Sequence, residues 1–219
     1  SDAERAALRG AELRIARHLV DAAEPGGEAV ADALRLIASA AAHAGTVADL
    51  HRRSVEVLEA DLVELCDRAL RAADETKTPA GRVRALAARA YELGEGADPK
   101  EALRRLRAAA DAARKDGLSE KEEVNLLQEV VRRSEEGLGG GARPEDHRRL
   151  AGYARRLGDL AAKEDPKAAA PWFVKAGEHF VLARDPKQAK AMLAEVERHD
   201  PTAAGAAALR GKIEALKPG

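Results

Sequence analysis

The sequence predicts an all-α protein of about ten short antiparallel helices. Hydrophobic residues make up 45% of the 219 residues and aromatic residues only 2%, so Ala, Leu and Val supply most of the apolar side chains. Ala and Leu have the strongest helix propensities among them, and the abundant Arg, Glu and Lys follow closely. Aromatic residues, which favour strands, are scarce. Small core side chains let helix axes approach closely, so tightly packed helices are the expected architecture.

The first three helices are predicted from the spacing of apolar residues and from the breaks between them. Pro25-Gly26-Gly27 ends the first helix, and Gly45 with Thr46 separates the second from the third as C-cap and N-cap. The third helix is expected to be the longest. The predicted ranges are Ala3–Glu24, Glu28–Ala44 and Val47–Asp74.

Seven further helices follow. Thr78 and Pro79 are the expected N-cap and first residue of the next one, and the glycine-rich segment Gly137–Arg143 is the expected mobile loop or boundary. The predicted regions are 1–75, 79–136, 137–143 and 144–219. The predicted helices cover Pro79–Leu93, Asp98–Asp116, Ser119–Glu136, Pro144–Glu164, Pro166–Arg184, Pro186–His199 and Pro201–Lys217.

Charge and hydropathy argue against two kinds of partner. Lys and Arg total 37 and Asp and Glu total 38, and this balance lacks the basic surplus typical of nucleic-acid-binding domains. No apolar run reaches the roughly 18–20 residues that span a bilayer, so no membrane partner is expected. The chain begins at Ser1 without Met, which indicates trimming and leaves room for a removed targeting segment. The cytoplasm is the default expectation, and the Ala-Arg-Gly bias favours a natural bacterial protein over a designed one.

Asp-Pro-Lys occurs three times, at Asp98–Lys100, Asp165–Lys167 and Asp185–Lys187, each time before a predicted helix. The Asp side chain can accept hydrogen bonds from the first free amides, and Pro at the first helical position loses no hydrogen bond. The motif is therefore interpreted as an efficient helix start without functional weight.

The segment after Trp172 has a more specific pattern. It reads Phe173-x-x-Ala176-Gly177-x-x-Phe180, then Ala189-x-x-x-Leu193, then Val196 and Pro201. The tetratricopeptide repeat places aromatic, small, large apolar and closing Pro residues at these offsets. Residues 170–203 resemble that family, with Ala176 replacing the usual Leu. A looser resemblance covers residues 80–116 through Leu86, Ala90, Leu93, Ala102, Leu106 and Ala109.

The resemblance implies antiparallel hairpins stacked as a right-handed α-solenoid, with Gly177 at a helix–helix contact. It also implies a non-catalytic scaffold without a cofactor, which binds a protein, a peptide or a second copy of itself in a concave groove. Carried over residue by residue, the groove positions are Val174, Glu178 and Val181 in the clearer copy and Arg84, Ala87 and Tyr91 in the looser one. They lack the Lys and Asn cluster with which some members of the family bind a C-terminal carboxylate.

The alternative is a helical-bundle receptor for a small ligand, or an enzyme, with a site between the N-terminal helices and the repeat. It predicts a closed cavity in which histidines and carboxylates converge. Glu195 and His199 lie four residues apart and could share a metal, although an ion pair at a helix end is the simpler interpretation. The single cysteine, Cys66, is interpreted as a small buried apolar residue. The histidines are scattered at His18, His43, His51, His147, His179 and His199.

Overall fold

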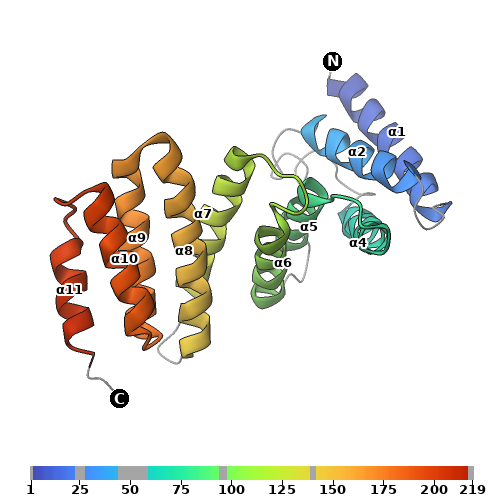
Figure 1. The fold of residues 1–219 in the computed structure, drawn as a ribbon. Coiled ribbons are helices and arrows are strands. Elements are labelled where there is room, and N and C mark those ends of the chain that lie inside the picture. The colour runs from blue at the N-terminus through green and yellow to red at the C-terminus, as the bar shows by residue number, and fades with distance from the viewer. Residues whose placement is uncertain (1, 23–27, 44–58, 94–97, 139–141, 217–219) are drawn as a thin grey trace. The chain divides into compact units, whose positions relative to one another are not determined.

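The structure, a computed structural model, describes residues 2–22, 28–43, 59–93, 98–138 and 142–216. These residues form ten helices and no strand, which confirms the all-α prediction (Figure 1). The chain divides into two compact units, Ser1–Ser119 and Glu120–Gly219. The division falls inside the predicted region 79–136, and the glycine-rich segment lies in the second unit. Residues 139–141 of that segment are outside the described part of the chain.

The N-terminal unit contains five described helices. Helix α1 packs against α2, α4 packs against α5, and α5 packs against α6. A shared core joins α1, α2, α4 and α5, and it includes Val30, Ile37, Leu65 and Val83. The predicted long third helix is described only from Glu59 onward, so its earlier residues cannot be compared. The bounds are α1 Asp2–Asp21, α2 Glu28–His43, α4 Glu59–Thr76, α5 Gly81–Leu93 and α6 Pro99–Ala112.

The start predicted for α5 at Thr78 and Pro79 is wrong. Lys77 adopts a left-handed conformation with φ 57°, and the Thr78 amide donates to the Ala73 carbonyl at 2.9 Å. This hydrogen bond closes the C-terminal end of α4, as in the usual left-handed helix termination. Helix α5 begins only at Gly81. An N-cap threonine would accept through its hydroxyl, but the Thr78 hydroxyl pairs with that of Thr76 at 2.7 Å, which is the physical reason for the error.

The C-terminal unit also contains five helices, which run side by side in Figure 1. The contacts of α9 with α8 and with α10 are extensive, and α11 packs on both α9 and α10. Phe173, Phe180, Met192 and Leu209 are buried in one core between these helices. The bounds are α7 Glu120–Gly137, α8 Pro144–Glu164, α9 Pro166–Leu182, α10 Pro186–His199 and α11 Ala206–Glu214.

The three Asp-Pro-Lys motifs are helix starts, as predicted. Each Asp is the N-cap of its helix, and its side chain accepts a backbone hydrogen bond from within the first turn. Asp98 and Asp165 accept from the third residue of the motif at 2.9 Å, and Asp185 accepts from Gln188 at 3.1 Å. These caps set the beginnings of α6, α9 and α10.

The last helix begins later than predicted. Pro201 was expected to start it, but α11 starts at Ala206. The Asp200 carboxylate accepts hydrogen bonds from the Thr202 amide at 2.9 Å and from its hydroxyl at 2.7 Å, and holds the chain in a turn. The predicted start at Pro201 is therefore wrong. The Asp200 carbonyl accepts from the Ala203 amide at 3.0 Å, three residues on, whereas at the start of α6 the Asp98 carbonyl accepts from the Ala102 amide, four residues on, as an α-helix requires. Among the described helices, none combines the length and the apolar character needed to cross a bilayer.

Candidate functional site

Helix α9 contacts a different neighbour on each of two faces. On one face, Lys175 Nζ and His179 Nε2 lie 2.5 and 3.5 Å from Glu135 Oε1 of α7. On the other, Glu178 Oε1 lies 2.5 Å from Lys212 Nζ of α11. The structure thus places α9 between α7 and α11 in the C-terminal unit.

The clearer set of predicted groove residues lies on the α11 side of α9. Val174, Glu178 and Val181 are each half-buried and follow one another at helical spacing. A Cβ atom at Gly205, just before α11, would lie only 2.5 Å from a methyl carbon of Val174. The three residues therefore form one stripe, but Val174 and Glu178 already contact α11 or the turn before it.

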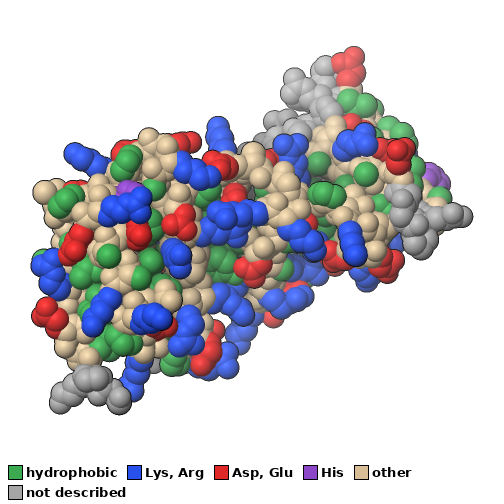
Figure 2. Space-filling view, viewed as in Figure 1, with side chains coloured by type: hydrophobic (Ala, Val, Ile, Leu, Met, Phe, Trp, Pro, Cys, Tyr) green, Lys and Arg blue, Asp and Glu red, His purple; other side chains and the backbone are tan. Residues whose placement is uncertain are grey.

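Leu182 extends this stripe into solvent. It lies one turn beyond Glu178 and is 55% exposed, which is high for a large apolar side chain. The sequence analysis missed it, although its spacing from Glu178 places it on the same helix face. The viewed face of the C-terminal unit carries Lys, Arg, Asp and Glu side chains of both signs interspersed with apolar ones (Figure 2). Leu182 thus gives the outer face of α9 an exposed apolar side chain.

The looser set of groove residues has structural contacts in the N-terminal unit. Arg84 donates to Asp74 at 2.7 Å and to Asp116 at 3.0 Å, and so links α5 to the end of α4 and to the turn after α6. Ala87 is 2% exposed and belongs to the core. The structure therefore leaves Ala87 without a surface for a partner, and Arg84 with two carboxylates beside it.

Tyr91, the third residue of this set, is covered by a cation. The guanidinium of Arg105 lies 4.6 Å from the centre of the Tyr91 ring. Arg105 also donates to both carboxylate oxygens of Asp67, at 2.7 and 2.9 Å, and to Glu101 at 3.0 Å. Stacking and two-point hydrogen bonding are the interactions that arginine makes best. This network joins α4, α5 and α6, which gives Tyr91 a role in packing.

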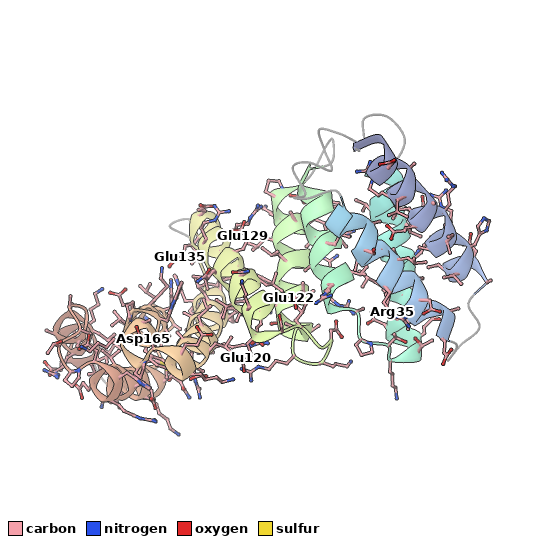
Figure 3. The ribbon with its side chains drawn as sticks, turned by 90° about the horizontal axis from the view of Figure 1, so that it is seen from above. Arg35, Glu120, Glu122, Glu129, Glu135 and Asp165 are labelled. Atoms are coloured by element: carbon pink, nitrogen blue, oxygen red, sulfur yellow. The ribbon has the colours of Figure 1, made fainter. Side chains whose placement is uncertain are left out.

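A polar cluster around the buried His179 in the C-terminal unit was not anticipated. His147 of α8 and His179 of α9 face each other with their Nδ1 atoms 3.1 Å apart. Glu135, labelled on α7 in Figure 3, lies beside His179, with 3.5 Å between its Oε1 atom and His179 Nε2. His179 is 9% exposed. The pKa of His179 lies below its ordinary value, mainly because burial disfavours the charged ring. The hydrogen bond and negative charge of Glu135 raise this pKa, while the positive charges of His147 and Lys175 lower it further. Sequence reasoning missed the cluster because its members are brought together only by helix packing.

Two other predicted features are where the sequence analysis expected them. His199 Nε2 lies 3.5 Å from Glu195 Oε2, as expected for an ion pair, and its ring lies against Phe173 with the centres 5.5 Å apart. Cys66 is free and fully buried, and burial raises the pKa of its thiol to about 12. Within the described residues, no group of three or more His, Cys, Asp or Glu side chains could hold a metal ion.

The fold and these contacts define an all-α protein with two helical units. No protein-family model matches the chain, and no curated protein matches its sequence.

Proposed function

We propose that the chain is a non-catalytic protein-interaction scaffold of the tetratricopeptide-like type. In this proposal its C-terminal unit binds a peptide, a helix or a partner subunit along the outer face of α9. The observation that carries the proposal is the burial of the residues at repeat-like positions. Phe173, Ala176, Gly177, Phe180, Ala189 and Val196 are all buried where α9 packs on its neighbours.

Burial of these positions leaves a different set of α9 side chains toward the outside. Leu182 is exposed, while Val174 and Val181 are half-buried at its edge. Large apolar side chains in a polar surround are typical anchors for a partner. The ion pair of Glu178 with Lys212 and that of Lys175 with Glu135 flank this edge. The partner that fits best has an apolar anchor between charges of both signs, as an amphipathic helix has.

The test compares two equally exposed leucines in the full-length chain. Leu182→Glu changes the proposed face, and Leu8→Glu is the matched control, because Leu8 is 49% exposed on α1 of the other unit. Partners captured by the unmodified chain are identified, and the dissociation constant of each is then measured for all three proteins by calorimetry. We expect Leu182→Glu to weaken binding at least about tenfold, an effect typical of an interface hot spot.

Circular dichroism of each variant verifies that the helices are intact. Equal affinities for Leu182→Glu and the unmodified chain would overturn the proposed face, and an effect of Leu8→Glu alone would move the interface to the N-terminal unit. A folded chain that binds no protein would favour the alternative of a small-ligand receptor or enzyme, for which a metabolite screen is the next measurement.

A further inference from the structure

His147 and His179 meet through the nitrogens of their rings. The ring centres are 5.4 Å apart and the ring planes differ by 23°, while the two Nδ1 atoms are 3.1 Å apart. The distance between the ring centres exceeds the distance between the Nδ1 atoms by about twice the distance from an imidazole centre to its nitrogen. Both Nδ1 atoms therefore lie close to the line between the ring centres. This is the geometry of an N–H···N hydrogen bond. Such a bond needs a hydrogen on one facing nitrogen and a lone pair on the other.

Glu135 determines which nitrogen of the neutral pair carries the hydrogen. Its Oε1 atom lies 3.5 Å from His179 Nε2, on the far side of the ring from His147. The carboxylate favours a hydrogen on Nε2, so Nδ1 of neutral His179 keeps its lone pair and accepts from His147 Nδ1–H. Contacts between titratable side chains thus run from His147 on α8 through His179 on α9 to Glu135 on α7.

We propose that His147 and His179 form a proton-sharing pair that makes the packing of α8 on α9 sensitive to pH. One added proton can be accommodated, because protonated His179 donates its new Nδ1–H to His147, which becomes the acceptor through its other tautomer. A second proton places N–H groups on both facing nitrogens and two positive charges side by side. The hydrogen bond is then lost and the two rings repel each other.

The surrounding charges reinforce the resistance to protonation. Lys175 Nζ lies 2.5 Å from Glu135 Oε1, so the carboxylate beside His179 already has a cation. Asp185, the N-cap of α10, lies 3.9 Å from Arg148 of α8 and so also has a cation beside it. On α11, Lys212 is paired with Glu178, whose side chain points to the other side of α9. No carboxylate other than Glu135 is therefore placed to stabilise a charged pair among the described contacts.

The sign of the pH dependence follows from burial. Burial lowers the pKa of His179 in the folded protein below the ordinary value of 6.5, so the unfolded chain binds protons more readily. The contribution of His179 to stability is therefore fully present above about pH 6.5 and decreases as the pH falls below it. Where the unfolded chain binds one proton more than the folded chain, each unit by which the pH falls shifts the folding equilibrium about tenfold toward the unfolded chain.

A metal ion is a poorer occupant of the space between the rings. Zinc needs about 2.0–2.1 Å to each imidazole nitrogen, which a straight 3.1 Å path between the nitrogens does not provide. The described residues also offer no group of three ligands. The geometry accordingly favours a shared proton.

The first test is an NMR titration of the histidine rings in the full-length chain, with His147→Gln and His179→Gln used to assign the signals. We expect the pair to titrate in two separate steps, with neutral His179 protonated at Nε2, and the remaining ring of either variant to titrate in one step. Coupled groups titrate in this way. Independent titration of both rings at ordinary values, unchanged by either substitution, would overturn the proposal.

The second test measures unfolding by urea at several pH values through the fluorescence of Trp172. It is the only tryptophan and lies on α9, so its signal reports on the C-terminal unit. Between about pH 7.5 and 5, the range in which histidines titrate, the unmodified chain should lose more stability than His179→Gln. His18→Gln, at an exposed position of α1, should behave like the unmodified chain. Equal pH dependence of all three proteins would overturn the proposal, and the NMR titration of the unmodified chain decides it even if a variant fails to fold.

Discussion

Two glycines of α8 allow the packing of the C-terminal unit to be tested with a single added methyl group. A Cβ atom at Gly158 would lie 2.7, 2.8 and 2.9 Å from three ring carbons of Phe173, whereas a Cβ atom at Gly152 would meet nothing within 4 Å. Both glycines are inside the same helix. Substitution by Ala therefore changes the helix propensity equally at the two positions, and only Gly158→Ala introduces a clash.

The expected magnitude follows from the surroundings of the Phe173 ring. Phe173 is 1% exposed and its ring lies against His199, so it cannot move away without disturbing the core. Overpacking of this kind costs about 1–3 kcal/mol, while Gly to Ala within a helix contributes about 0.5–1 kcal/mol of stability. Gly152→Ala should therefore stabilise the unit slightly. Gly158→Ala should be less stable than Gly152→Ala by about 1–3 kcal/mol, because the propensity term cancels between them.

Thermal and urea unfolding followed through Trp172 fluorescence provide the assay. For a unit of this size, 1 kcal/mol corresponds to a shift of about 4–8 °C in Tm, so the two variants should differ by several degrees. Circular dichroism verifies that both retain their helices. If Gly158→Ala and Gly152→Ala had the same Tm, the close packing of α8 on Phe173 would be refuted.

Three further predictions concern other contacts. Gly177→Leu should lower Tm by several degrees, since even an added Cβ atom would lie 2.5 Å from a methyl carbon of Leu209. An unchanged Tm would show that Gly177 is not at the contact between α9 and α11. Arg84→Gln should destabilise the N-terminal unit by about 1–3 kcal/mol, because the Asp116 side chain is only 7% exposed and loses its cation; urea unfolding by circular dichroism that matches the unmodified chain would contradict this. Burial raises the pKa of the Cys66 thiol to about 12, so thiol reagents at neutral pH should modify it only after urea is added; rapid labelling of the native chain, followed by mass spectrometry, would argue against its burial.

The capping signals were the most reliable part of the sequence. The three Asp-Pro-Lys starts are correct because Asp and Pro act on the backbone within one turn, so no distant contact is needed. The two wrong starts, at Thr78 and Pro201, also have local causes. At Thr78 the side-chain hydroxyl pairs with the hydroxyl of Thr76, and at Asp200 the carbonyl accepts from the Ala203 amide in a turn, where a helix start would use the amide four residues on. Competition between two local hydrogen-bonding patterns is not decided by residue type alone.

The predicted groove illustrates how much of a binding site can be inferred from the spacing of residues along a helix. Val174, Glu178 and Val181 lie on one face of α9, as their spacing indicates. Spacing did not reveal that α11 packs beside that face, that Leu182 continues it into solvent, or that Ala87 is buried. Exposure depends on which helix covers which face. The groove itself and the solenoid arrangement stay predictions.

The sequence by itself determined that this protein is helical, where most of its helices begin and end, and which positions of α9 and α10 turn toward a core, because these properties depend on residues within a few turns of one another. Only the tertiary structure brought Glu135, His147 and His179 into one cluster and placed Phe173 over Gly158. Those contacts join residues on different helices, and their distances depend on the packing of whole helices, which no local pattern encodes.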